Sequence, residues 1–545
     1  MSIRTLLLLV LFAAPTACSQ ASGPTDTDGA TKPKVDRVIL AVAAPRREGN
    51  EMRHFAGPDS WQLRPMYESL IGIDPNNGAL VPQLATEWKL EPNASSIRFK
   101  LRQGTPFHDN WGEVTAKDAS VAWKEIVKED SLSGTRPYWV RTLREIEIVN
   151  DYEVIFHLTR PDGHFFESVS EARGSFEVHS SAHLANQGPA TMQTRPLAGT
   201  GPYRYQEREQ GSFLRYERAF EKHWRSNPDF PEFEFRWVRE PSTRLAALLT
   251  GEIHMADLPQ DLQPQSVQRG FQVLKGRVPA LRTFVEFICC NFVDNNDFSK
   301  GYAQPDSPMR DKKVRQALSK AVNRDELNKA FFAGKGEPMI VNHFHPSRIG
   351  WNPEWERRFQ ELYGFDQAKA RSLLAEAGFG PQNLYGVTMR VAPLAGYSGG
   401  EDVTEAIAAA WRSVGVKVDL VNIDEAQWTP QVRAFRLINY ATMAATNATQ
   451  WTGSTIYSTS TGPRAGAEVA EVDTIVKELL GTLDEGKQKE LWARLGNAKF
   501  EAVHELPLFW LPVEAVVDPK VVADWGYPGS LSGSWSHVDL IRAAR

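Results

Sequence analysis

Cysteine is scarce in this chain of 545 residues, with three copies. A scaffold stapled by several disulfide bonds is therefore excluded, and the fold must depend on its hydrophobic cores. Two of the three, Cys289 and Cys290, are neighbours in the segment FVEFICCNF, which has the composition of a β-strand. Because successive side chains of a strand point to opposite faces, we expect both residues to pack as separate thiols.

The chain also lacks an excess of positive charge. Its 62 Lys and Arg residues are interspersed among 67 Asp and Glu residues, which gives a net charge of −5. Proteins that bind nucleic acids concentrate positive charge on one face, so no nucleic-acid partner is expected. The sequence has no G-x-x-x-x-G-K-[ST] segment, so we expect no phosphate-binding loop of that kind.

A long hydrophobic run is absent beyond the N-terminal segment, so we expect a soluble mature chain without a transmembrane helix. The N-terminal segment itself contains Arg4, the short apolar run Leu6–Ala14, and small residues up to Ala17. This order of charged, apolar and small residues is typical of a secretory signal peptide. The sequence therefore predicts an exported protein, located in the periplasm or on the cell surface.

Cys18 directly follows the signal core and resembles the modified cysteine of a lipoprotein, although Pro15 stands where such signals usually have leucine. We expect residues 1–18 to be the signal and Cys18 to carry a lipid that tethers the protein to a membrane. Ordinary cleavage nearby is the alternative. Residues 19–35 are rich in Ser, Gly, Thr, Asp and Pro, which predicts a flexible linker.

Hydrophobic residues are plentiful, at 42% with 10% aromatic, so a chain of this length can build several cores. Strand-like and helix-like patterns alternate along the sequence. The segment from Thr115 to Val127 predicts a helix with Thr115 as its N-cap and Asp118 in its first turn. Residues 146–149 and 154–158 predict a β-hairpin.

The second half contains the clearest helical patterns. Residues 311–332 predict one helix, on which we expect Arg315 and Arg324 to lie on a solvated face. The strand VTMRVAPL, a helix from Asp402 to Val414 and the strand VKVDLVNI form a βαβ unit, which implies a parallel sheet. The predicted fold class is therefore α/β.

Six sequence blocks occur in an order shared by one known family. They are YESLIGIDPNNGALVPQLATEW from Tyr67, IRFKLRQGTPFHDNWGEVTAKD from Ile97, GTGPY from Gly199, LAALLTGEIHMAD from Leu245, MRDKKVRQALSKAVNRDEL from Met309, and FDQAKARSLLAEAGF from Phe365. In this order the blocks resemble the bacterial extracellular solute-binding proteins of family 5, which serve oligopeptide and dipeptide ABC importers. The resemblance runs from about Tyr67 to Trp510.

The resemblance implies a two-lobed periplasmic-binding-protein fold of type II, with an extra α/β subdomain inserted in the first lobe. Lobe I would comprise residues 36–70, 197–284 and 516–545. The subdomain would comprise residues 71–196, and lobe II residues 285–515. The two lobes would close over a ligand that the protein captures without converting it.

The function implied is the substrate-binding component of an ABC importer. The protein would capture a peptide or another small polar solute and deliver it to permease subunits in the membrane, whose ATPase partner supplies the energy. No enzymatic activity and no cofactor are implied, and we expect a monomer. An exported receptor that senses its ligand on the same scaffold is the alternative.

Two short motifs could indicate other chemistry. Residues 396–400 read G-x-S-x-G, which would make Ser398 the nucleophile of a secreted serine hydrolase. The stretch is rich in glycine and the resemblance places an ordinary βα loop here, so we interpret Ser398 as a loop residue. His343 and His345 could share one face of a strand and hold a metal ion, but Pro346 follows and no carboxylate lies close in sequence. We therefore predict no metal site.

A peptide site needs a carboxylate for the amine of its ligand and a cation for the carboxyl group. The resemblance places that acid within residues 441–457, a segment that contains no Asp or Glu. Its polar and aromatic residues predict contacts to an uncharged polar end group instead. The predicted ligand-binding residues are Tyr67, as a wall of the cleft, Trp428, Asn447, Thr449, Gln450 and Trp451. A core position is an equally good interpretation of Trp428.

Two further motifs are interpreted as structural. Gly199 and Gly201 let the backbone of GTGPY turn tightly, because glycine tolerates a positive φ. His108 lies in a predicted turn of the subdomain beside Asp109. We expect this histidine to be structural rather than part of an acid/base pair.

Overall fold

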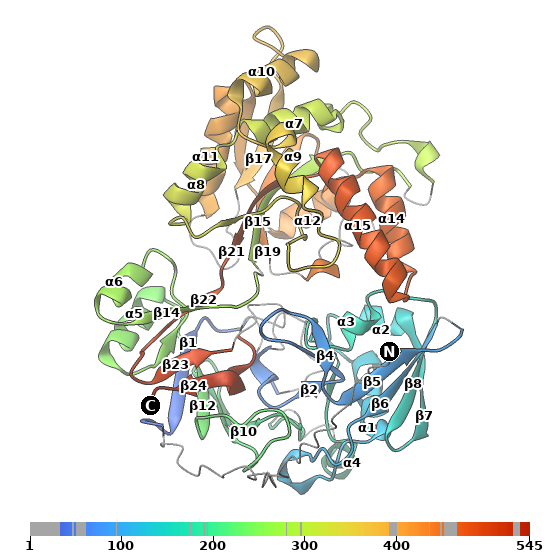
Figure 1. The fold of residues 1–545 in the computed structure, drawn as a ribbon, viewed down its shortest axis with the longest axis vertical. Helices are drawn as coiled ribbons and strands as arrows, with labels where there is room; N and C mark the ends of the chain where they lie inside the picture. Colours follow the sequence, from blue (N-terminus) through green and yellow to red (C-terminus); the bar gives the residue numbers. More distant parts are fainter. Residues whose placement is uncertain are drawn as a thin grey trace, which may run out of the picture.

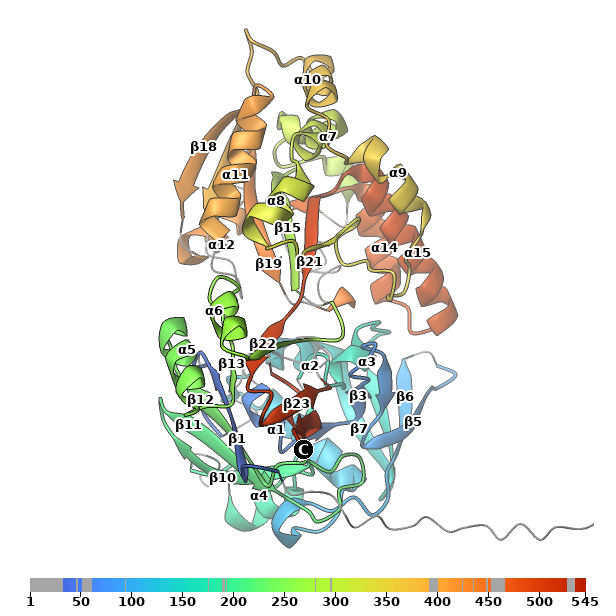
Figure 2. The same cartoon turned by 60° about the vertical axis from the view of Figure 1, so that its left-hand side comes forward.

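The computed structural model shows two halves, one above the other, linked through a narrow waist (Figures 1 and 2). The lower half contains both the first strand and the C-terminal residues of the chain, and the upper half contains its middle part. The structure describes residues 33–45, 48–50, 61–93, 95–174, 176–188, 192, 194–279, 281–294, 297–391, 400–423, 425–434, 436–446, 449–451, 466–526 and 535–545.

Lobe I, in the lower half, is built on a seven-stranded mixed sheet with the order β10-β11-β12-β1-β13-β22-β14. These strands are β1 (Arg37–Val42), β10 (Tyr203–Glu209), β11 (Phe213–Arg218), β12 (Glu232–Trp237), β13 (Met255–Ala256), β14 (Gln272–Lys275) and β22 (Glu514–Val517). Helices α5 (Pro241–Thr250) and α6 (Gln263–Gln268) follow β12 and β13 in the chain. Leu245 and Leu248 of α5 pack on the sheet against Ala41 and Val516.

The other part of the lower half contains a four-stranded antiparallel sheet, which we call the subdomain. Its order is β5 (Ala85–Leu90), β6 (Ser96–Leu101), β8 (Glu153–Leu158) and β7 (Leu143–Asn150). The subdomain helices are α1 (Ala116–Val127), α2 (Arg136–Thr142), α3 (Phe165–Ser168) and α4 (Ser181–Gln187). Phe99 and Phe156 of the sheet pack against Phe165 of α3 in a shared aromatic core.

The lower half also contains three short strand pairs. They are β2 (Glu68–Ser69) with β9 (Glu177–Val178), β3 (Ile71–Ile73) with β4 (Leu80–Pro82), and β23 (Val522–Trp525) with β24 (Ile541–Ala543). The pairing of β2 with β9 joins segments about a hundred residues apart in the sequence.

Lobe II, the upper half, is built on a second seven-stranded sheet with the order β16-β21-β15-β19-β17-β18, and β20 pairs with β15. The strands are β15 (Leu281–Cys289), β16 (Glu337–Pro338), β17 (Gly386–Val391), β18 (Lys417–Asn422), β19 (Tyr440–Thr446), β20 (Gly466–Ala467) and β21 (Leu506–Leu511). Its helices are α7 (Lys312–Lys320), α8 (Arg324–Phe331), α9 (Glu354–Leu362), α10 (Gln367–Glu376), α11 (Gly400–Ser413), α12 (Glu425–Arg433), α14 (Ala470–Leu480) and α15 (Glu485–Ala502).

Two hydrophobic clusters hold lobe II together. The larger cluster joins one face of the sheet to α7, α8, α10 and α11. The second joins α14 and α15 to α9 through Trp355, Val476 and Trp492. In Figures 1 and 2 the lower ends of α14 and α15 point down toward the subdomain.

Several local predictions are confirmed. Helix α1 begins after Thr115, whose hydroxyl and backbone N–H both donate to the Asp118 carboxylate. Strands β7 and β8 form the predicted antiparallel hairpin. Strands β17 and β18 are parallel and connected through α11, as the βαβ pattern predicted. These features depend on residues close in sequence, so the local pattern was sufficient.

The single helix predicted over residues 311–332 is wrong. The chain ends α7 at Lys320 and starts α8 at Arg324, with the side chain of Asn323 accepting a hydrogen bond from Glu326 N as the new N-cap. The solvated face predicted for Arg315 and Arg324 is also wrong, since both are buried. Arg315 donates to the carbonyls of Ala502 and Val503 at the end of α15, and Arg324 donates to Pro507 O. The two buried guanidinium groups thus bond to carbonyls at the end of α15 and in β21.

The prediction of two separate thiols is wrong as well. Cys289 and Cys290 form a disulfide bond between neighbouring residues. Cys289 is the last residue of β15, and Cys290 lies beyond it with a φ of 65°. The alternation of side chains that argues against such a bond holds only inside a strand, and the strand ends between the two cysteines.

Gly199 and Gly201 are needed for a different reason from the one expected. Neither is among the described glycines with a positive φ. A Cβ atom on Gly199 would lie 2.0 Å from Met66 O, and one on Gly201 would lie 2.5 Å from Pro65 O. Glycine therefore lets this turn approach the chain before β2. His108 is buried beneath it and hydrogen-bonds Gly201 O through Nε2, which fits the structural role predicted for this histidine.

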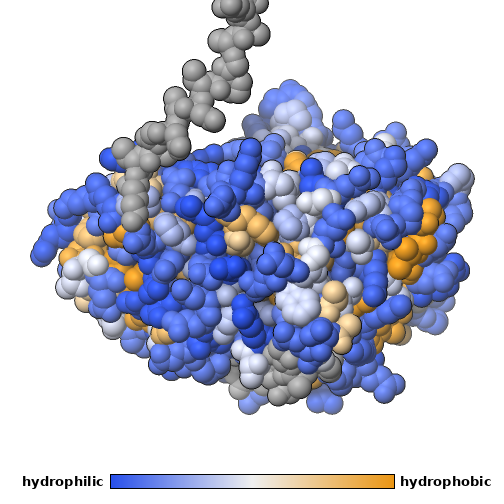
Figure 3. All heavy atoms as spheres, turned by 90° about the horizontal axis from the view of Figure 1, so that it is seen from below, coloured by the Kyte–Doolittle hydropathy of each residue, from blue (hydrophilic) through white to orange (hydrophobic). Residues whose placement is uncertain are grey.

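Seen from below, the surface of the lower half is mainly hydrophilic, with apolar residues in separate patches (Figure 3). Within the part of the chain that the structure describes, no helix has the length and apolar character needed to cross a bilayer.

Candidate functional site

The two lobes are connected by two chain segments that cross side by side. One leads from β14 into β15 and the other from β21 into β22, and both pairs of strands are antiparallel. Gly276 N donates to Val513 O at 2.8 Å between these pairs. Lys335 of lobe II reaches across to lobe I, where its Nζ lies 2.8 Å from both Glu514 Oε2 and Gln263 Oε1. The two lobes are therefore joined by two hydrogen-bonded chain segments and by the ion pair between Lys335 and Glu514.

A second contact joins lobe II to the subdomain. Gly163 N, just before α3, donates to Leu480 O at the end of α14 at 2.8 Å. The ring of Trp451 lies against this loop, 5.3 Å from the ring of His164, and is 4.9 Å from the ring of Trp492 on α15. A Cβ on Gly163 would lie 2.5 Å from Trp451 Cη2, so this glycine is required by close approach.

The contact between subdomain and lobe II favours an uncharged histidine. Burial lowers the pKa of His164 to about 4, although Asp162 raises it. At neutral pH the imidazole is therefore neutral and packs on Trp451 as an aromatic ring.

Three of the predicted ligand-binding residues lie together at this lobe junction. Thr449 is buried, Gln450 donates through Nε2 to Ile349 O at 2.8 Å, and Trp451 forms the contact with the subdomain. They follow β19, so the end of that strand positions them.

The structure places two other predicted residues in cores. Tyr67 is buried in lobe I, and its hydroxyl donates to Leu197 O at 2.8 Å. Trp428 packs against Ile288 in lobe II, with the guanidinium of Arg390 at 4.7 Å from its ring centroid. Neither side chain makes a described contact with Thr449, Gln450 or Trp451. Asn447, Cys18 and Ser398 lie outside the described residues.

The two histidines of the His343-x-His345 motif have different partners. His343 accepts a hydrogen bond from Arg282 Nη1 at its Nε2, while His345 pairs with Glu337 at 2.8 Å and with the hydroxyl of Ser347. The backbone of His343 has a φ of 76°, so the motif is not a regular strand with both rings on one face. The described residues include no group of three or more potential metal ligands.

A pair of arginines lies on one tryptophan at the base of lobe II. The guanidinium carbons of Arg348 and Arg282 are 4.6 and 6.0 Å from the ring centroid of Trp510. Arg348 Nη2 donates to Pro279 O, on the crossing segment, at 2.7 Å. Burial and the charge of Arg282 together lower the pKa of Arg348 to about 9, against the opposing effect of Glu167 in the subdomain. Arg348 is therefore influenced by charges from both halves of the molecule.

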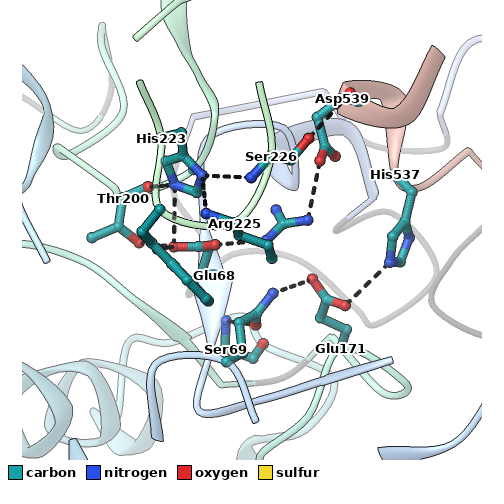
Figure 4. A network of polar contacts seen from close by, with 12 residues as sticks. Glu68, Ser69, Glu171, Thr200, His223, Arg225, Ser226, His537 and Asp539 are labelled. Atoms are coloured by element: carbon teal, nitrogen blue, oxygen red, sulfur yellow. Dashed lines mark hydrogen bonds and ion pairs between the residues drawn. The ribbon is translucent and has the colours of Figure 1, made fainter. Parts of the chain in front are cut away.

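A polar network connects lobe I with the subdomain and the C-terminal residues (Figure 4). Glu68 of β2 is fully buried and accepts hydrogen bonds from Thr200 Oγ1 at 2.9 Å and Arg225 Nε at 3.0 Å. Arg225 Nη1 continues to Asp539 at 3.0 Å. Burial by itself would lower the pKa of Arg225, but the charges of Asp539 and Glu68 outweigh it and raise the pKa. Glu171 lies beside this group, where Gln83 Nε2 donates to it at 2.7 Å.

A small pocket lies at the edge of this network, with room for about one water-sized group. Its lining includes Arg64, Glu171, Arg225, His537 and Asp539. The network already bonds most of these groups, while the Nε and Nη1 atoms of Arg64 have no partner among the described atoms. The pocket is too small for a peptide or another solute of similar size, so we interpret the network as a structural contact between lobe I and the subdomain.

Residue patterns did not point to Gly163, His164, Arg348 or Trp510. Gly163 follows an Asp in a turn, and Trp510 belongs to the apolar run LPLFWLP, where an aromatic residue suggests a core. Arg348 follows the histidine motif, and its proximity to Trp510 depends on pairing across lobe II.

The sequence matches one protein family over residues 79–463, the bacterial extracellular solute-binding proteins, family 5 (middle part). This span exceeds half of the chain, and the chain belongs to this family. Two curated relatives are similar along much of their length. The dipeptide-binding protein of Escherichia coli (strain K12) is 24% identical over 388 residues, covering 68% of each chain. The glutathione-binding protein GsiB of Pectobacterium atrosepticum is 24% identical over 470 residues, covering 83% of each.

The fold is shared with solved structures. HbpA2 from Haemophilus parasuis superposes with a TM-score of 0.73 at 19% identity, covering 93% of this chain and 99% of that chain. The predicted two-lobed, type II periplasmic-binding-protein fold, with its α/β subdomain, is confirmed. The family and these relatives are named for binding rather than for catalysis.

Proposed function

We propose that the protein is the substrate-binding component of an ABC importer and captures a peptide or another small polar solute between its lobes. Membership of solute-binding family 5 carries this proposal. The names of two relatives, which bind a dipeptide and glutathione, support a peptide-like ligand. The connection through two crossing segments suits a protein whose lobes close around a ligand and then dock on permease subunits.

The ligand site of this proposal lies at the lobe junction. We assign hydroxyl, amide and ring contacts to Thr449, Gln450 and Trp451, and an amide contact to Asn447, which precedes them in the sequence. Their position where lobe II meets the subdomain supports the assignment. Tyr67 and Trp428 are assigned to packing, because each is buried in the core of its own lobe.

The cellular setting completes the proposal. An exported, monomeric protein tethered through a lipid on Cys18, with residues 19–35 as linker, would present the lobes to a membrane permease. The proposed division is lobe I at 36–70, 197–284 and 516–545, the subdomain at 71–196 and lobe II at 285–515. The sheets support this division approximately, with crossings a few residues earlier than the proposed bounds: the lobe II sheet begins at Leu281 of β15, and the chain is back in the lobe I sheet at Glu514 of β22.

The ligand is best identified by mass spectrometry of the small molecules that co-purify with the protein. Scattering before and after removal of that ligand should show a more compact bound form. Trp451→Ala should weaken binding by tenfold or more, and Trp88→Ala, on the subdomain sheet, should not. A protein that binds no solute from periplasmic extract, and whose scattering never changes, would refute solute capture.

The tether has its own experiment. Cys18→Ala should release the protein from membranes in fractionated cells, whereas Cys18→Ala with unchanged fractionation contradicts the lipid anchor. Ser22→Ala provides a control, because it lies in the same proposed linker and leaves Cys18 in place.

A further inference from the structure

The contact between lobe II and the subdomain includes a leucine of one half that is buried in the core of the other. Leu483 lies in the loop between α14 and α15 of lobe II, and 4% of its surface is exposed. It belongs to the hydrophobic cluster of the subdomain, the cluster that also contains Phe99 and Phe165. Part of the contact between the halves is therefore an apolar side chain removed from water.

Hydrogen bonds within lobe II fix the loop that presents Leu483. Gln488 Nε2 donates to Thr482 O at 2.6 Å, and Lys487 N donates to the Asp484 carboxylate at 2.8 Å. The leucine therefore lies between two anchored neighbours, on a loop continuous with α14 and α15. Since the loop moves with lobe II, a rotation of the lobe away from the subdomain must withdraw this side chain from the subdomain core.

The facing loop is fixed to the subdomain in a similar way. His164 N donates to the Asp162 carboxylate at 2.9 Å, and the next residue, Phe165, is buried in the aromatic core. Gly163 donates its backbone N–H to Leu480 O of lobe II at 2.8 Å. This hydrogen bond and the buried leucine thus join two anchored loops from different halves of the molecule.

The subdomain is held to lobe I by more extensive contacts. Strand β2 pairs with β9, and buried Glu68 binds Arg225, which continues to Asp539. Rotation about the two crossing segments would therefore carry lobe II away from lobe I and the subdomain together. In Figures 1 and 2 the lower ends of α14 and α15 lie to one side of the crossing segments, so their contact with the subdomain breaks when the lobes part.

We propose that Leu483, together with the hydrogen bond from Gly163 to Leu480, forms a latch that favours the closed arrangement of the lobes before any solute is bound. The inference rests on the proposed function and adds how closure is controlled. A buried leucine and a hydrogen bond together change the ratio of closed to open molecules by about a hundredfold. The solute-free protein then contains closed as well as open molecules, and a solute needs to supply less of the free energy of closure. Leu483 and Gly163 are positioning residues that act on affinity through closure.

Small-angle scattering of the full chain without solute tests the latch. Bound solute is removed by unfolding in urea, dialysis and refolding. Leu483→Ala should have a larger radius of gyration than the wild type, because the ratio of closed to open molecules falls about tenfold or more. Leu491→Ala is the matched control, since Leu491 lies on α15 and is buried in the second cluster of lobe II. This control should lower the thermal midpoint and leave the radius of gyration unchanged.

Gly163→Ala is a second variant, and it decides the question if Leu483→Ala does not fold. The added Cβ would lie 2.5 Å from Trp451 Cη2 and 2.7 Å from Leu479 O, both in lobe II, and no atom is removed from either core. This variant should therefore also open the solute-free protein. A wild-type protein as extended as Gly163→Ala, or a folded Leu483→Ala protein as compact as the wild type, would overturn the inference. Equal opening in Leu491→Ala would count against it as well.

Hydrogen exchange of the same solute-free proteins separates a latch from a contact that stabilises the subdomain. In Leu483→Ala the peptide that contains Gly163 should lose protection, while β6 and β8 keep theirs. Equal loss of protection in β6 and β8 would mean that Leu483 supports the subdomain itself, and would contradict the latch. Because neither measurement contains solute, failure of the latch leaves solute capture intact. A protein that binds no solute from periplasmic extract would refute solute capture without affecting the latch.

Discussion

Replacing Glu68 by glutamine removes the central charge of the network that joins lobe I, the subdomain and the C-terminal residues (Figure 4). The carboxylate is completely buried and receives donors from Thr200, Arg225 and, at 3.3 Å, Trp224 Nε1. Breaking a buried ion pair by removal of one partner costs about 3–5 kcal/mol. The Arg225 side chain is 24% exposed, so water recovers part of that cost. We therefore expect Glu68→Gln to lower the free energy of unfolding by about 3 kcal/mol.

Two further substitutions provide smaller expected losses of stability for comparison with Glu68→Gln. Thr200→Val removes one hydrogen bond to the same carboxylate and leaves the ion pair, so a loss of about 1 kcal/mol is expected. Glu87→Gln removes an exposed partner of Lys100 on the subdomain and should change stability by less than about 0.5 kcal/mol.

Urea unfolding followed by tryptophan fluorescence measures all three variants under the same conditions. The order Glu68→Gln, Thr200→Val, Glu87→Gln in decreasing loss is the expected result. A Glu68→Gln protein within about 1 kcal/mol of the wild type would refute the reasoning. In that case other packing contacts would hold lobe I and the subdomain together, and the polar network would add little to stability.

Three other predictions concern separate features. Burial lowers the pKa of His108 from its usual 6.5 to about 4. The neutral imidazole therefore stabilises the fold above pH 6.5, and this contribution is lost as the pH falls toward 4. In urea unfolding, the free energy of unfolding should fall by about 2–3 kcal/mol between about pH 7 and 4.5 because of this residue. His108→Gln should make that decrease smaller, and an unchanged pH profile in the variant would contradict the prediction. Gly163→Ala should cost about 1–3 kcal/mol in the same assay, because its Cβ would lie 2.7 Å from Leu479 O, whereas Gly386→Ala, with open space around it, should be nearly neutral. Alkylation in denaturant should modify Cys289 and Cys290 after reduction and neither before it; labelling of both without a reductant would disprove the disulfide.

Short-range patterns predicted much of the fold. The capping of α1 by Thr115, the hairpin of β7 and β8, and the parallel unit of β17 and β18 each depend on residues within about 40 positions of one another. The order of six blocks predicted the family and, through it, the two lobes. Gln450 and Trp451 lie at the lobe junction with Thr449 beside them, and the ligand-binding role of the three residues stays a prediction.

Other features depended on partners far away in the chain. Arg315 looks like a surface residue by its spacing, yet its carbonyl partner Val503 lies 188 residues away and buries it. Gly199 and Gly201 were expected to serve a turn, and their actual constraint is the chain before β2. The disulfide between Cys289 and Cys290 depends on where β15 ends, which its pairing with β19, β20 and β21 determines.

The family, the α/β class and the elements whose contacts are local were predictable from the sequence. The side chains that meet where the halves join were not: Gly163 and His164 contact Trp451, and Arg348 contacts Trp510 and Pro279. The reason is that the hydrophobic periodicity of a segment indicates which face of its helix or strand is buried, but not which residues of another element pack against that face. Contacts across the junction depend on that opposite surface, so these pairs could be recognised only in the folded protein.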